Sequence, residues 1–216
     1  MTVEIAVDSV HAFLERVCSI RHTWNRESAS YFDPWFRGMR DVSNELMPSL
    51  YRLDLATMEQ SIRRSFHRIG VNMAVEHPPS DEWAWYFIMQ HHRAPTRLLD
   101  WTDGALLALF FATAPATAGL PEVSTDAAVW MLDPYWLNKS TVGTDGIVSW
   151  YSKEANQYLS PLTDQDASLS PALPIAISPP HIVRRIAVQR ARFTLFGREP
   201  LGLQKLAEEK GSRLLK

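Results

Sequence analysis

The sequence has little cysteine, little net charge and no long apolar run. Cys18 is the only cysteine among 216 residues, so no disulfide can form within the chain, and we expect a reducing, cytoplasmic location. The formal net charge of -2 excludes a general electrostatic attraction to nucleic acid and leaves room only for a local basic patch. The longest apolar run, Ala105 to Ala112, is far shorter than the ~20 residues that span a bilayer, so no contact with a membrane is expected.

The composition is that of a folded globular protein. Hydrophobic residues make up 46% of the chain, which is too apolar for a disordered protein. Eight tryptophans and an aromatic content of 11% indicate a tightly packed core, a cleft that stacks flat ligands, or both.

Hydrophobic periodicity and turn signals predict helices in the first half of the chain and strands later, which is an α+β fold. The expected helices cover residues 1–30, 55–70, 81–92 and 104–114, with Ser80 capping the third and Thr102 or Asp103 capping the fourth. The expected strands cover residues 31–38, 96–101, 127–132, 175–178, 185–189 and 192–196. Residues 138–173 are expected to form a loop with one short helix, and residues 201–216 an amphipathic helix or a tail.

The densest polar cluster is the stretch from Gln90 to Thr102, QHHRAPTRLLDWT, which lies between two apolar helices. Polar groups in such a setting must be paired or must line a cavity, because burying them unpaired is costly. One interpretation is structural: Arg97 pairs with Asp100, and His91 bonds a backbone carbonyl. The other is a functional site. By contrast, Trp101 is expected in the core, since it lies between Leu99 and an apolar helix.

A second candidate is the tripeptide Phe36-Arg37-Gly38 at the end of an expected strand. Its arginine can direct a guanidinium into a cleft, and its glycine lets a ligand approach the backbone. A third stretch, Gln189 to Thr194, is expected to be an exposed basic strand or turn when taken alone.

Taken together, these motifs resemble the FRG domain family. The resemblance rests on Phe36-Arg37-Gly38, Pro48-Ser49-Leu50-Tyr51-Arg52, Gln90-His91-His92 and Pro95 to Thr102, with weaker likeness at Ala127–Trp130 and from Arg185 to Phe193. It implies an FRG domain over residues 30–197, a helical N-terminal extension over 1–29 and a C-terminal helix or tail over 198–216. Arg93 stands where the resemblance leads us to expect glycine.

The resemblance also implies a bacterial or phage protein with a toxin-like or antiphage-defence role, and therefore a neutralising partner protein. The expected fold has a helical N-terminal part and a small, mostly antiparallel sheet around a central cleft. In motif style it resembles ADP-ribosyltransferases, which use NAD as a substrate and modify a nucleic-acid or protein acceptor.

By that analogy, NAD would be held by charge-assisted hydrogen bonds and by close backbone approach. The predicted cofactor-binding residues are Arg37, Gly38, Gln90 and Arg97, and the predicted catalytic residues are Arg37, His91, Thr96, Asp100 and Gln189. If a carboxylate is required, the candidates are Glu82, Asp100 and Glu154. The reaction depends mainly on positioning and electrostatics.

An alternative is a nucleic-acid-binding or nuclease-like domain that uses His91, His92 and Asp100 for acid–base chemistry. Adjacent histidines on a helix point about 100° apart, and no cysteine set or HxxxH pair is present, so no zinc site or other metal is expected. The arginines that could contact phosphates are Arg63, Arg64, Arg68, Arg184, Arg185, Arg190 and Arg192, of which the first three also suit a solvated helix face.

Overall fold

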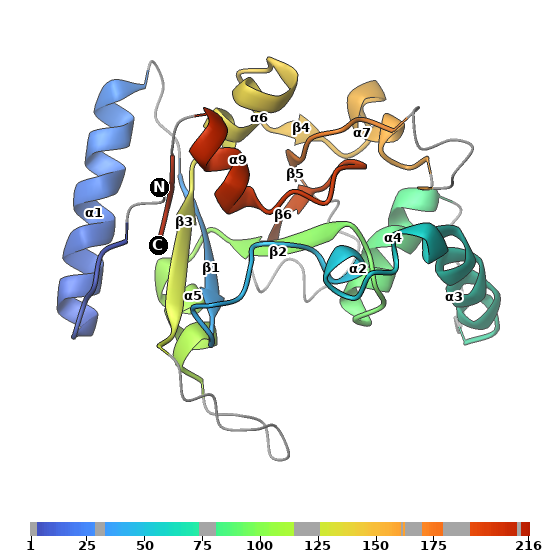
Figure 1. Ribbon diagram of the computed structural model, residues 1–216, viewed down its shortest axis with the longest axis horizontal. Helices are drawn as coiled ribbons and strands as arrows, with labels where there is room; N and C mark the ends of the chain where they lie inside the picture. The colour runs from blue at the N-terminus through green and yellow to red at the C-terminus, as the bar shows by residue number, and fades with distance from the viewer. Residues whose placement is uncertain are drawn as a thin grey trace. The chain divides into compact units, whose positions relative to one another are not determined.

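The computed structural model describes residues 4–28, 33–73, 81–114, 126–160, 162, 170–178, 191–210 and 213–216 (Figure 1). The chain forms two compact units, each assembled from segments that are distant in sequence. The first unit contains Met1–Glu45, Trp101–Pro134 and Leu203–Lys216, and the second contains Leu46–Asp100 and Tyr135–Gly202.

The strands are hydrogen-bonded in the order β4-β5-β6-β2-β1-β3-β7. Their bounds are β1 Trp35–Met39, β2 Leu98–Thr102, β3 Ala128–Leu132, β4 Val148–Ser149, β5 Ile175–Ser178, β6 Ala191–Leu195 and β7 Leu214–Leu215. Among the registered pairs, only β4 with β5 is parallel. The predicted α+β class with a mostly antiparallel sheet is therefore confirmed, whereas the central cleft and the ADP-ribosyltransferase-like arrangement stay predictions.

The helices account for the rest of the described regular structure. They are α1 Val10–Glu27, α2 Ser49–Arg52, the 3-10 turn η1 Ala56–Met58, α3 Glu59–Met73, α4 Glu82–His91, α5 Ala105–Thr113, α6 Pro134–Val142, α7 Lys153–Gln157 and α9 Leu203–Lys210. Within the described residues, no helix is long and apolar enough to cross a membrane.

In the first unit, β1 pairs with β3 along its whole length, from Trp35 opposite Leu132 to Met39 opposite Ala128. Helix α5 packs directly on β1 (Figure 1). On the other side of β3, β7 continues the pairing. Arg213 next to β7 donates to Asp133 at 3.1 Å and to Glu27 at 3.2 Å, so it ties the end of α1 to the end of β3.

In the second unit, α4 provides much of the core. Its sequence is apolar on nearly every side, and every residue from Trp83 to Phe87 is buried, as the pattern predicts. Of these, Trp83, Tyr86 and Phe87 belong to one core cluster. It also contains Ile175 and Ile177 of β5 and Phe193 and Leu195 of β6. The buried helix thus fixes the position of the segment that follows it.

Two expected helix caps are wrong. Helix α4 is capped by Asp81 rather than Ser80, because the Asp81 carboxylate accepts from Trp83 N at 3.1 Å and from Ala84 N at 3.3 Å. Helix α5 begins after Gly104, because Thr102 is still part of β2 and Asp103 lies in the connecting bend. The Thr102 hydroxyl instead accepts from Gly104 N at 3.2 Å.

The second half of the chain contains more regular structure than its polar composition predicts. The expected loop over 138–173 includes most of α6, strand β4 and helix α7. Helix α7 is short but has a side-chain cap, since Ser152 Oγ accepts from Ala155 N at 3.1 Å. The expected strand over 185–189 lies outside the described residues.

Candidate functional site

The candidate site begins where α4 ends. Arg93 has a positive φ of 61°, its N–H donates to Gln90 O at 3.0 Å, and Ala94 N donates to Met89 O at 2.9 Å. This is the Schellman arrangement, in which glycine usually occupies the position that Arg93 takes here. The turn therefore keeps a glycine-type conformation even though the sequence has arginine.

Beyond this turn, three side chains form a hydrogen-bonded relay. The buried hydroxyl of Thr96 donates to Gln90 Oε1, and Gln90 Nε2 donates to Asp100 Oδ2 at 2.7 Å. Thr96 is itself held in place, because its oxygen accepts from Leu98 N at 3.2 Å. We call Thr96, Gln90 and Asp100 the relay. Its Asp100 carboxylate is exposed, whereas Thr96 at its other end is buried.

Two histidines lie beside the relay on the end of α4. His91 is the last residue of the helix and is half-buried, whereas His92 is exposed. Their rings lie 5.0 Å apart at an interplanar angle of 80°, in agreement with the divergence expected for neighbours on a helix.

Arg97 does not face the relay. Its side chain is fully buried, and Nε donates to Glu59 Oε1 at 2.9 Å. Its terminal nitrogens donate to Ser170 Oγ at 3.2 Å, to Tyr158 O and to Ser160 O at 3.1 Å. The expected pair with Asp100 is wrong, because extended residues three apart point to opposite sides of the backbone.

The Arg97–Glu59 pair is the centre of a buried polar cluster. Tyr86 Oη donates to Glu59 Oε1 at 3.0 Å and accepts from Arg97 N at 2.8 Å, and Leu162 N donates to Glu59 Oε2 at 3.2 Å. Burial alone would lower the pKa of Arg97, but the neighbouring Tyr86 and Glu59 raise it above its usual value. Burial also raises the pKa of Tyr86, so its hydroxyl stays protonated and able to donate.

Sequence reasoning missed both Glu59 and Tyr86. Glu59 opens α3 as a polar residue in an acidic first turn, and Tyr86 is one of several aromatic residues on α4. Neither position carries a local pattern that distinguishes it from a surface acid or a core aromatic. The one available signal is Arg97 itself, since a buried guanidinium requires a carboxylate somewhere in the fold.

The predicted residues Arg37 and Gly38 lie in the first unit, on β1. Arg37 is opposite Trp130 of β3, and both are central in the paired region. A Cβ added to Gly38 would lie 1.9 Å from Ala108 O and 2.7 Å from Ala112 N of α5. The space beside Gly38 is therefore taken by a helix backbone, which explains the glycine by packing. Gln189 lies outside the described residues.

The alternative carboxylates are less well placed than Asp100. The side chain of Glu82 is 74% exposed and lies 3.8 Å from Arg63. Glu154 is in the first turn of α7, where bonds from its own backbone N–H and from Ser152 lower its pKa. Among the described residues, no group of acidic, histidine and cysteine side chains is arranged to hold a metal ion. Trp101 is buried in the core, as expected.

Comparison with known families identifies one part of the chain. Residues 33–119 match the family model of the FRG domain, a range that includes β1, α3, α4, β2 and α5. No curated protein matches the chain, and no solved structure matches it either.

Proposed function

Because the chain carries an FRG domain over residues 33–119, we propose that it is an NAD-dependent enzyme that resembles ADP-ribosyltransferases, with Asp100 as its catalytic carboxylate. The supporting observation is the relay, in which Gln90 orients an exposed carboxylate and buried Thr96 orients Gln90. A carboxylate that is exposed and oriented by Gln90 can meet a substrate without first losing conformational freedom.

The chemistry asked of Asp100 is modest. In the transfer, the bond between C1′ of the nicotinamide ribose and the nicotinamide nitrogen breaks, and the electron pair leaves with nicotinamide. A nucleophile of the acceptor then bonds to C1′, and its proton passes to Asp100 or to water. Positive charge develops on the ribose during this step, so a nearby carboxylate stabilises the transition state. Gln90 and Thr96 act through Asp100 and are positioning residues.

The structure gives the other three predicted NAD-binding residues, Arg37, Gly38 and Arg97, different surroundings. Arg37 lies in the first unit, and its role of holding an NAD phosphate by charge-assisted hydrogen bonds stays a prediction. Gly38 is explained by the packing of α5, and Arg97 is enclosed by Glu59, Ser170, Tyr158 and Ser160, so neither is needed for the proposal.

The proposed acceptor is a nucleic acid or a protein, and the proposed biological role is a toxin-like or antiphage-defence effector with a neutralising partner protein. This part of the proposal is supported by the family resemblance alone. It predicts that induced expression of the chain arrests bacterial growth, and that Asp100→Asn relieves the arrest while the protein accumulates to the same level.

The decisive experiment is nicotinamide release from NAD by the purified chain, with and without RNA, DNA and cell lysate. Asp100→Asn removes the charge at an exposed position and should abolish release with little change in melting temperature. Glu154→Gln is the matched control, because it neutralises an exposed carboxylate outside the relay. Absence of nicotinamide release under every condition would overturn the proposal.

The same segment suits a second candidate, the cleavage of RNA or DNA by His91, His92 and Asp100. The observation that favours it is the pair of imidazoles 5.0 Å apart at the end of α4, next to the residue whose side chain holds Asp100. Cleavage that needs no NAD and is lost in His91→Gln would favour this candidate over transfer chemistry.

A further inference from the structure

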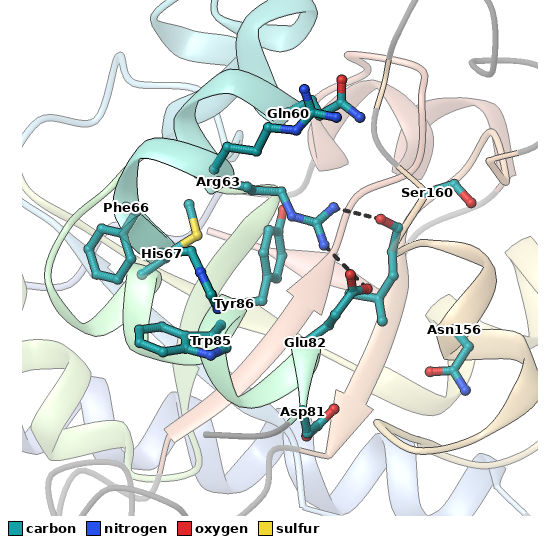
Figure 2. A pocket seen from close by; sticks show the side chains of 13 residues that line it. Gln60, Arg63, Phe66, His67, Asp81, Glu82, Trp85, Tyr86, Asn156 and Ser160 are labelled. Carbon is teal, nitrogen blue, oxygen red and sulfur yellow. Dashed lines mark hydrogen bonds and ion pairs between the residues drawn. The ribbon is translucent and has the colours of Figure 1, made fainter. Parts of the chain in front are cut away.

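A separate pocket lies within the second unit, between α3, α4 and the turn after α7 (Figure 2). Its volume is about 810 Å³, which is large enough for a drug-sized or nucleotide-sized ligand. Neither Asp100 nor Gln90 nor Thr96 lines it. Ligand binding in this pocket therefore goes beyond the proposed function and does not depend on it.

Two helix faces form the walls of this pocket. On α3, the lining side chains from Gln60 to His67 include positions three, four and seven apart, which share one face of a helix. On α4, the lining positions from Glu82 to Met89 follow the same spacing. The pocket thus arises where one face of each helix is turned toward the other. Asn156 at the end of α7 and Leu159 and Ser160 in the turn after it close the side.

One end of the pocket is aromatic. The His67 ring lies 4.7 Å from the Trp85 ring, and Phe66 meets Trp85 edge-on at 6.5 Å (Figure 2). Trp85 is buried and supported from behind, since the Gly70 position leaves room for its ring. His67 is exposed, so a flat ring can stack beside it at this end of the pocket.

The charges around the pocket are mostly matched within the protein. Asp81 accepts from two backbone N–H groups of α4, and Arg63 donates to Leu159 O at 2.6 Å and lies 3.8 Å from Glu82. Arg64 differs, because no interaction within the described part of the chain engages its guanidinium. Among the described residues, the pocket therefore combines the Arg64 guanidinium, which has no partner there, with an aromatic wall.

Amide groups complete the set of potential ligand contacts. Asn156 accepts from Trp83 Nε1 at 2.7 Å through its oxygen, which leaves its Nδ2 donors for other partners. Gln60 also lines the pocket and, within the described residues, makes no side-chain hydrogen bond. Such amides can read the polar edge of a heterocyclic base.

We propose that this pocket binds the nucleoside 5′-monophosphate group of a nucleotide. The base stacks at Trp85 and His67, the phosphate pairs with Arg64, and the exposed Glu82 carboxylate accepts from ribose hydroxyls. Among the described residues, the aromatic surface, the Arg64 guanidinium and the exposed Glu82 carboxylate, which is 3.8 Å from Arg63, match a base, a phosphate and a diol. A free nucleotide, NAD and the 5′ end of an RNA all carry this group.

The test is calorimetric titration of the full chain with AMP, with adenosine and inorganic phosphate as partial ligands. AMP should bind at least tenfold more tightly than either part, because base and phosphate contacts are made together. Arg64→Ala should weaken AMP binding by about tenfold or more. Arg68→Ala is the matched control, since it removes a positive charge one turn along α3 outside the pocket and should leave the affinity unchanged.

Further arms identify the source of the group and the role of the aromatic wall. Parallel titrations with NAD and with a 5′-phosphorylated oligoadenylate show which carrier binds best. His67→Ala should change the affinity for AMP but not for inorganic phosphate. The Asp100→Asn variant should bind AMP with the same affinity as the unaltered chain. AMP binding can therefore be judged even if the proposed NAD reaction is not observed. No AMP binding, or equal effects of Arg64→Ala and Arg68→Ala, would overturn the inference.

Discussion

Arg93 holds a left-handed backbone conformation that costs most residues about 1 kcal/mol or more relative to glycine. Its N–H and that of Ala94 are both bonded within the turn, so the native geometry is well determined. Arg93→Gly is therefore expected to raise the free energy of unfolding by about 1 kcal/mol, as measured by urea denaturation. Arg93→Ala keeps the strain and should give no such gain; a glycine variant less stable than the native chain would contradict the account.

The buried pair of Arg97 and Glu59 leads to a second expectation at the same scale. Arg97→Met leaves the Glu59 carboxylate buried without its cation and should lower the free energy of unfolding by about 3–5 kcal/mol. Urea denaturation also checks the double variant Arg97→Met/Glu59→Leu, which removes both charges and should be more stable than Arg97→Met. If the double variant is the less stable of the two, the pair is not the main interaction of either residue.

The Arg97–Glu59 pair and the relay differ in how far apart their residues lie in the sequence, and this decides which of them can be inferred without a structure. Gln90, Thr96 and Asp100 lie within one short polar segment, so their density is visible without a structure. Glu59 lies 38 residues before Arg97, and only the packing of α3 brings the two together. Local spacing therefore led to the wrong partner for Arg97 and to suitable candidates for the relay.

At the scale of elements, the contact between α5 and β1 depends on Gly38. A methyl group at this position would meet the backbone oxygen of Ala108 and the backbone nitrogen of Ala112, which cannot rotate away as a side chain can. Gly38→Ala is expected to destabilise the fold by about 1–3 kcal/mol or more, seen as a lower melting temperature. Gly104→Ala is the matched control, because its nearest heavy atom would be Leu107 Cβ at an ordinary 3.4 Å. Equal effects of the two changes would refute this explanation.

Elements with a strong local signal were predicted well, and those that depend on context were not. Strand β5 matches its expected range because an apolar run is bounded by prolines, and α4 matches because of its acidic first turn and its terminating Arg93-Ala94-Pro95. Helix α6 begins at Pro134, where the Asp133-Pro134 pair indicated only the end of a strand. Strand β7 has only two residues, too few to give a strand pattern in the sequence. It is a strand because it pairs with β3.

At the scale of the whole molecule, three buried tyrosines make stability sensitive to alkaline pH. The hydroxyl groups of Tyr51, Tyr86 and Tyr158 donate to Gly197 O, Glu59 Oε1 and Leu173 O, and burial raises the pKa of each tyrosine. In the unfolded chain tyrosine ionises near pH 10, whereas the folded chain retains these protons. Stability is therefore complete below about pH 10 and falls as the pH rises above it.

Urea denaturation between pH 8 and about pH 11 checks this expectation. Tyr158→Phe should reduce the steepness of the alkaline loss, because it removes one group that must stay protonated. Tyr151→Phe should leave the steepness unchanged, since Tyr151 is 70% exposed. A free energy of unfolding that stays constant across this range would refute the assignment.

The division of the chain also determines the order in which its parts can be finished during synthesis. The first unit starts at the N-terminus but needs β7 and Arg213, whereas the second unit ends at Gly202. On the ribosome, strand β1 is therefore made early and must wait for the last residues to arrive. All segments of the second unit, including its buried Arg97–Glu59 pair, are synthesised before the first unit is complete. A nascent chain ending at residue 202, stalled behind a linker long enough to clear the ribosomal exit tunnel, should therefore contain a later-starting unit that resists protease and an earlier-starting one that does not.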